Sequence, residues 1–115
     1  MNNIDNEKLL HTAIEDYEPY TKSQRKLLAA FIELAVDDIV SISVISLSKL
    51  LGISRFAIYK NLNFLESDNA IKKLNDGKEG RLTGFQLNQD KLNNIEATYV
   101  QKQKYINNIS KIDKN

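Results

Sequence analysis

The segment from residue 43 to residue 65 reads SVISLSKLLGISRFAIYKNLNFL and contains two short helix patterns separated by a glycine. In the first pattern apolar residues recur at helical spacing over residues 44–51, and Ser43 is a natural N-cap. Gly52 stands where a left-handed residue commonly ends a helix, and Ser54 can cap the next one. The segment therefore predicts a helix, a tight turn and a second helix.

The second helix is expected to have an apolar face and a contact face. Ile58, Leu62 and Leu65 are spaced i, i+4 and i+7, which places them on one stripe suited to burial. The opposite face then contains two cations, two aromatic rings and an amide, namely Arg55, Phe56, Tyr59, Lys60 and Asn63. A solvated helix face more often mixes glutamate with lysine, so this composition indicates a surface that contacts a partner.

Two helices are predicted before this segment. Residues 7–17 form an amphipathic pattern that should end before Pro19. A longer helix should begin at a capping box formed by Thr21 and Gln24, and its apolar stripe continues to the acidic residues 37–38.

Short strands are predicted on either side of the two central helices. Residues 39–42 are rich in β-branched side chains and favour a brief strand. Residues 71–74 and 82–87 alternate loosely around a polar, glycine-containing centre, which predicts a β-hairpin with a long tip over residues 75–81.

A final helix is predicted over residues 90–113, and at 1.5 Å per residue it would be about 35 Å long. That is longer than a domain of this size needs to cover its core, and the helix of residues 7–17 also has an apolar stripe without an obvious partner. We therefore expect a homodimer, whose interface would contain Leu10, Ile14, Tyr17, Leu92, Ile95, Tyr99, Ile106 and Ile109. The alternative is that both helices pack back onto their own domain.

Composition restricts the possible functions. The chain has 115 residues, a net charge of +1, no cysteine and a single histidine, His11. Disulfides and thiolate chemistry are excluded, a zinc site is not expected, and no nucleophile motif or glycine-rich phosphate loop accompanies the histidine. We expect no catalytic residues, no metal and no cofactor. The first residues do not resemble a signal peptide and no window is apolar enough to span a membrane, so a cytoplasmic, nucleoid-associated location is expected.

The order helix, strand, helix, glycine turn, helix and hairpin is that of the winged helix-turn-helix family, which residues 21–88 resemble. The resemblance is carried by LSKLLGISRFAIYKNLNFLESDNAI, residues 47–71, in which the turn and core positions of the family are matched by Leu47, Ser48, Leu51, Gly52, Ile53, Ser54, Ile58, Leu62, Leu65 and Ile71. Ser48 stands where alanine is usual, and Asn69 stands where glycine is usual.

The resemblance implies a mainly α fold with a small β-hairpin and a winged helix-turn-helix domain over residues 21–88. The extra N- and C-terminal helices predicted in segments 1–20 and 89–115 lie outside the resemblance and are expected to serve dimerisation. The resemblance also implies that the second central helix lies in the DNA major groove and that the hairpin tip touches DNA nearby. The residues expected to contact DNA are Ser43, Ser54, Arg55, Phe56, Tyr59, Lys60, Asn63, Lys78 and Arg81.

These patterns lead us to expect a protein that binds specific double-stranded DNA as a homodimer and regulates transcription as a repressor. One alternative is a replication or maintenance protein of a plasmid, phage or mobile element that binds origin DNA. Another is a winged helix that binds proteins and not DNA, with Phe56 and Tyr59 forming a hydrophobic contact patch. No constellation of residues indicates a small-molecule effector.

Overall fold

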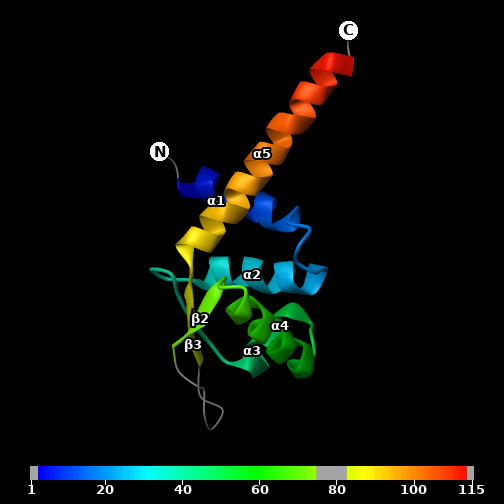
Figure 1. Ribbon diagram of the computed structural model, residues 1–115. Helices are drawn as coiled ribbons and strands as arrows, with labels where there is room; N and C mark the ends of the chain where they lie inside the picture. Colours follow the sequence, from blue (N-terminus) through cyan, green and yellow to red (C-terminus); the bar gives the residue numbers. More distant parts are fainter. Residues whose placement is uncertain (1–2, 75–82, 114–115) are drawn as a thin grey trace.

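The computed structural model describes residues 3–74 and 83–113, which form five helices and three strands. In chain order the elements are α1 (Asn3–Glu15), α2 (Lys22–Leu34), β1 (Ile39–Ile42), α3 (Val44–Leu51), α4 (Arg55–Ser67), β2 (Ile71–Lys73), β3 (Thr83–Leu87) and α5 (Gln89–Asp113). The predicted mainly α fold with a small hairpin and extra terminal helices is confirmed. Figure 1 shows α1 and α5 packed on one side of α2, with α3 and α4 on its other side.

The hairpin belongs to a three-stranded antiparallel sheet with the order β1-β3-β2. Val40 of β1 lies opposite Phe85 of β3, and Ile71 of β2 lies opposite Leu87 of β3. The brief strand predicted over residues 39–42 therefore pairs with the hairpin and makes β3 the central strand. The predicted hairpin tip, residues 75–81, lies outside the described residues.

The predicted helix ends are confirmed at four places. The Gln24 N–H donates to Thr21 Oγ1 at 3.2 Å, and the Thr21 N–H donates to Gln24 Oε1 at 2.9 Å, which completes the capping box. Ser43 and Ser54 each accept a hydrogen bond from the backbone N–H three residues further on. Gly52 has a φ of 65° and ends α3 in the left-handed conformation. These local signals therefore begin and end the helices where the sequence predicts.

The prediction that α2 continues to residues 37–38 is wrong, because the helix ends at Leu34. A two-residue turn follows, in which Val36 and Ile39 exchange backbone hydrogen bonds of 2.9 and 3.0 Å. Asp37 and Asp38 form the turn with φ values of 52° and 68°. Aspartate tolerates this left-handed conformation better than most residues, so the acidic pair makes a turn that leads into β1.

The first helix also differs from its prediction. It ends at Glu15, and Tyr17, expected on its apolar stripe, lies in an irregular turn. The Tyr17 and Tyr20 rings meet edge to face, with centroids 4.8 Å apart. The turn after α1 therefore contributes to packing even though it is not helical.

One continuous core joins the terminal helices to the remaining elements. It contains Ala13 and Ile14 of α1 and Leu92 and Ile95 of α5 together with the apolar residues of α2, α3, α4 and the sheet. Six of the eight residues predicted for a dimer interface consequently lie against their own chain: Leu10, Ile14, Tyr17, Leu92, Ile95 and Tyr99. The reason is that α1 and the first part of α5 cover each other's apolar stripes. The other two, Ile106 and Ile109, are 42% and 38% exposed.

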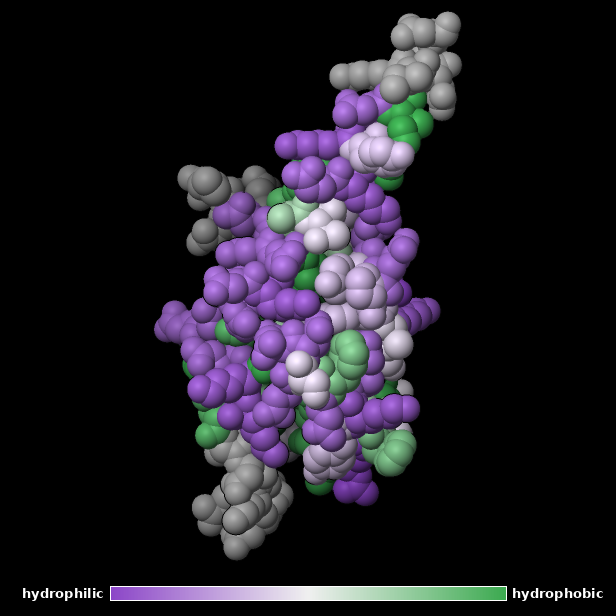
Figure 2. Space-filling model, in the orientation of Figure 1, coloured by the Kyte–Doolittle hydropathy of each residue, from purple (hydrophilic) through white to green (hydrophobic). Residues whose placement is uncertain are grey.

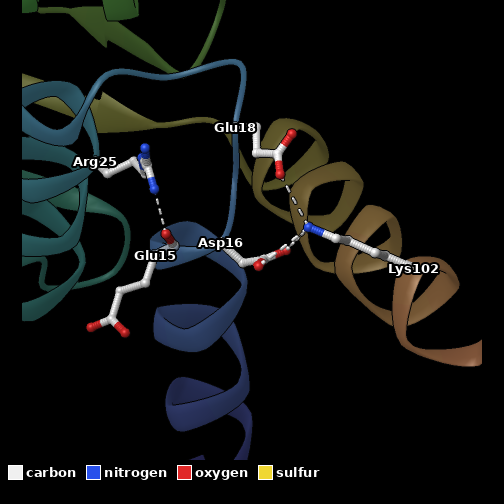
Figure 3. A network of polar contacts seen from close by, with 5 residues as sticks. All are labelled: Glu15, Asp16, Glu18, Arg25 and Lys102. Carbon is white, nitrogen blue, oxygen red and sulfur yellow. Dashed lines mark hydrogen bonds and ion pairs between the residues drawn. The ribbon is translucent and has the colours of Figure 1, made fainter. Parts of the chain in front are cut away.

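Lys102 of α5 occupies a position where the apolar spacing of the helix predicts another apolar residue. Its ammonium group lies 3.2 Å from Asp16 Oδ2 and 3.4 Å from Glu18 Oε1, in the segment after α1 (Figure 3). In the same segment Arg25 of α2 donates to the Glu15 carbonyl oxygen at 2.5 Å. These polar contacts fasten the end of α1 between α2 and α5.

Candidate nucleic-acid interface

Helix α4 is held against the core by the stripe predicted for it. Ile58 and Leu65 are fully buried, and Leu62 is 6% exposed. Asn61 is also buried, at 7% exposure, although it was not predicted. Its spacing of i+3 from Ile58 was the available signal, because residues 58, 61, 62 and 65 together follow the i, i+3, i+4, i+7 pattern of a buried helix face.

The opposite face of α4 is exposed, as predicted. Arg55, Phe56, Tyr59, Lys60 and Asn63 are all exposed, with Phe56 at 79% and Tyr59 at 56%. The structure therefore brings these five predicted contact residues together on one surface, which we call the α4 face. The five residues of the α4 face include no acid and combine two cations with two aromatic rings. The first acidic residue on the same side of α4 is Glu66, one turn beyond Asn63 toward the C-terminal end.

The turn before α4 is held by several hydrogen bonds. The Gly52 N–H donates to the Ser48 carbonyl oxygen at 2.9 Å, and the Ser48 hydroxyl donates to the Ile53 carbonyl oxygen at 2.5 Å. Lys26 of α2 donates to the Leu51 carbonyl oxygen at 2.8 Å. Ser48, which replaces the alanine usual in winged helices, thus satisfies a carbonyl group of the turn. These bonds fix the start of α4 relative to α3 and α2.

The end of α4 is anchored by a polar cluster around Asp68. The Tyr20 hydroxyl donates to Asp68 Oδ2 at 2.5 Å, and Lys91 Nζ of α5 lies 2.9 Å from the same oxygen. The Tyr20 ring also meets Phe64 of α4 edge to face, with centroids 5.3 Å apart. Both ends of the helix that carries the α4 face are therefore fixed to neighbouring elements.

The contacts of this cluster shift the proton equilibria of its members. Burial by itself would raise the pKa of Asp68, but the hydrogen bonds from Tyr20 and Lys91 outweigh it and lower the pKa below its usual value. Burial and the neighbouring carboxylate raise the pKa of the Tyr20 hydroxyl. The pKa of Lys91 is raised, because its contacts with Asp68 and Tyr17 exceed the opposing effect of burial. The cluster is thus a neutral tyrosine, a carboxylate and an ammonium group at neutral pH.

The other residues predicted to contact DNA do not belong to the α4 face. Ser54 is exposed at the start of α4. Ser43 is half-buried, caps α3, and its hydroxyl donates to the Ser46 hydroxyl at 2.9 Å, so a contact with DNA stays a prediction for it. Lys78 and Arg81 lie outside the described residues.

Two apolar side chains of α3 were not predicted to be exposed. Leu50 and Ile45 of α3 are 59% and 47% exposed, while Val44, Leu47 and Leu51 are buried. The buried residues follow i, i+3 and i+7 spacing, which leaves Leu50 beside the stripe. The sequence pattern included Leu50 with the apolar residues of the helix, since hydrophobicity alone does not separate a core residue from an exposed one.

No metal site or membrane span emerges from residues 3–74 and 83–113. No group of three or more histidine, cysteine, aspartate or glutamate side chains in these ranges could hold a metal ion. Within the same ranges, no helix is both long and apolar enough to cross a membrane. The Nε2 atom of His11 in α1 lies 3.2 Å from Glu33 Oε1 in α2.

No protein-family model and no curated protein sequence matches this chain. Solved structures do match in shape. The apo crystal structure of wild-type MarR from E. coli has a TM-score of 0.55 and 20% identity, covering 86% of this chain and 68% of that chain. The adhesin competence repressor AdcR from Streptococcus pyogenes has a TM-score of 0.52 and 20% identity, covering 95% and 74%.

A mutant of E. coli MarR complexed with operator DNA also matches, with a TM-score of 0.53 and 19% identity, covering 86% of this chain and 66% of that chain. At these identities the likeness establishes the fold. The chain has a winged helix-turn-helix fold, in which α3 and α4 are the helix-turn-helix pair and β2 and β3 flank the wing, as the sequence predicted.

Proposed function

We propose that this protein binds specific double-stranded DNA as a homodimer and regulates transcription as a repressor, with α4 as its recognition helix. The observation that carries the proposal is the exposed, acid-free α4 face on a helix whose two ends are anchored. In helix-turn-helix proteins this helix enters the major groove and contacts base edges with its N-terminal residues. Arg55 and Phe56 occupy that part of α4.

Electrostatics supports DNA as the partner of the α4 face. The net charge of the chain is only +1, so attraction to phosphates has to come from a local cluster of cations. Arg55 and Lys60 are exposed on α4, and Lys72 and Lys73 are exposed on β2, the strand that leads into the wing. Phosphate contacts from such residues would hold the helix in the groove, while the other side chains of the α4 face reach the bases.

The structural neighbours favour transcriptional regulation over the other DNA-related alternative, replication at an origin. One of them is described as a repressor, and another was crystallised with operator DNA. By analogy, we propose the same role for this chain. We propose no catalytic activity, and we propose that the protein is located in the cytoplasm, at the nucleoid.

The proposed dimer interface is the distal part of α5, within segment 89–115, because the apolar stripe of segment 1–20 packs against its own chain. Residues 104–110 are all exposed, and they include Tyr105, which is 67% exposed, beside Ile106 and Ile109. Figure 1 shows this part of α5 extending away from the rest of the chain, and Figure 2 shows a few hydrophobic residues among hydrophilic ones there. A symmetric pairing of two such helices would cover these side chains and present two α4 faces to DNA.

Selection of bound sequences from a pool of random DNA duplexes tests the proposal. We expect enrichment of an inverted repeat whose half-sites are about one helical turn apart, because a symmetric dimer presents two equivalent recognition helices. A reporter gene with the enriched sequence in its promoter should then be expressed less when the protein is present. A pool that shows no enrichment after repeated selection at low salt would contradict the proposal.

A further inference from the structure

The apolar ring of Phe56 is exposed to solvent, which is unfavourable for an apolar side chain. At 79% it is the most exposed large apolar side chain in the part of the chain that the structure describes. Among those same residues the aromatic ring contacts involve Tyr17, Tyr20, Phe64 and the pair Phe31 and Phe85, and not Phe56. Its ring is therefore free to meet a partner.

The place of Phe56 in α4 indicates where that partner would be. It is the second residue of the helix, directly after Arg55, and the Ser54 cap fixes the backbone there. Residues 56, 59, 60 and 63 follow one another at i, i+3, i+4 and i+7, so Phe56 begins the ridge that contains Tyr59, Lys60 and Asn63. In a helix lying in the major groove, a side chain at this position faces base edges.

The chemistry of the ring restricts what it can recognise there. Phenylalanine has no polar atom, so it cannot form the hydrogen bonds by which guanine, adenine and cytosine are distinguished in the major groove. The apolar group that a base pair presents in this groove is the C5 methyl of thymine. Recognition of the cytosine amino group typically uses a carboxylate, and the α4 face has none.

Charge on the same surface favours DNA over an apolar protein partner. Phe56 lies next to Arg55 and one turn from Lys60, and both cations are exposed. A hydrophobic protein surface would have to desolvate these two charges, whereas the phosphates beside a major groove would neutralise them. The Phe56 ring and its neighbouring cations together suit a methyl group at the base edges of a major groove that is bordered by phosphates.

We propose that Phe56 is a specificity-determining residue that packs on the C5 methyl of a thymine in each half-site. This inference rests on the proposed function and makes its ligand explicit. Burial of the thymine methyl group against the ring would contribute about 0.8 kcal/mol. Removing this methyl group from the DNA should therefore weaken binding about fourfold per half-site.

Replacement of thymine by deoxyuridine tests this directly, because it removes the methyl group and keeps every hydrogen-bonding group of the base pair. Duplexes of the sequence enriched from the random pool would be made with each symmetric pair of thymines replaced in turn. For one pair we expect the wild type to bind the uracil duplex about 15-fold more weakly than the thymine duplex, as two methyl groups are lost. Phe56→Ala should bind both duplexes almost equally.

Leu50→Ala is the matched control, since it also truncates an exposed apolar side chain near α4, and it should keep the wild-type ratio. Thermal unfolding of each variant would verify that it is folded. A wild type that binds DNA but is indifferent to uracil at every thymine overturns the inference and leaves the proposed function intact. A Phe56→Ala protein that keeps the wild-type ratio overturns the assignment to Phe56. A wild type that binds no duplex at all overturns both proposals.

Discussion

The Tyr20 hydroxyl donates a 2.5 Å hydrogen bond to Asp68 Oδ2, although the two residues are 48 positions apart in the sequence. Asp68 caps the C-terminal end of α4, and Tyr20 precedes α2. Lys91 of α5 contacts the same carboxylate. Helix α4, the proposed recognition helix, is thereby fixed to α5, which contains the proposed dimer interface. The distance between two α4 faces in a dimer would therefore depend on this cluster.

The stability of the fold should depend on pH through Asp68. Its pKa is lowered in the folded chain, so the carboxylate stabilises the fold above its ordinary pKa of 3.8, and this contribution is lost as the pH falls below that value. Urea unfolding at several pH values would measure it. We expect the free energy of unfolding of Asp68→Asn to decline less steeply with acid than that of the wild type, and Glu66→Gln, an exposed carboxyl nearby, to behave like the wild type. Identical pH profiles for all three proteins would count against the role of Asp68.

Tyr20→Phe should lower the free energy of unfolding by about 1 kcal/mol at neutral pH, because it removes one hydrogen bond to a carboxylate and leaves the aromatic packing in place. The value is below the usual range for charged acceptors, since the Asp68 side chain is 37% exposed and remains paired with Lys91. The Tyr20→Phe, Asp68→Asn double variant completes a double-mutant cycle. Strictly additive effects would show that the two side chains do not interact in solution.

Gly52 should resist replacement for a conformational reason. Its φ is 65°, and a Cβ atom there would meet no other atom within 4 Å, so the cost of a side chain comes from the backbone and not from a clash. We expect Gly52→Ala to lower the free energy of unfolding by about 1 kcal/mol and Gly52→Asn to cost less, because asparagine adopts this conformation more readily. Equal costs in chemical denaturation would indicate that strain at Gly52 is not the cause.

The proposed dimer interface can be tested with charges. Ile106→Lys with Ile109→Lys should give a monomer in analytical ultracentrifugation at micromolar concentration, because lysine at these positions would bury charge between the helices. Asn107→Lys with Asn108→Lys is the matched control, since it adds the same charge to exposed neighbouring positions of α5 that point away from the two isoleucines. A wild type that is already monomeric would remove the proposed role of distal α5.

Much of the fold was predictable because it depends on local signals. Thr21, Ser43 and Ser54 cap helices through contacts within three residues, and Gly52 and Asn69 adopt the left-handed conformation that their types allow. The periodicity of α4 likewise identified the exposed contact face. Such features depend on residues close together in the sequence and not on the rest of the chain.

Contacts between residues far apart in the sequence could not be predicted. The apolar stripe that contains Leu92 and Ile95 suits a second copy or the chain's own α1 equally well, and periodicity does not distinguish them. The bond between Tyr20 and Asp68 joins distant polar residues without any sequence pattern. The early end of α2 goes with a turn at Asp37 and Asp38, both left-handed, which the bridge between Val36 and Ile39 closes.

Binding of duplex DNA by the α4 face is measured most directly by titrating the enriched duplex with protein at several salt concentrations. We expect wild-type affinity to fall as salt rises, and Arg55→Ala with Lys60→Ala to bind more weakly with a salt dependence reduced by about two counterions. Lys22→Ala with Lys49→Ala removes the same charge from exposed positions of α2 and α3 and should match the wild type. An Arg55→Ala, Lys60→Ala protein with wild-type affinity and salt dependence, or a wild type that does not bind at low salt, would contradict the proposed interface.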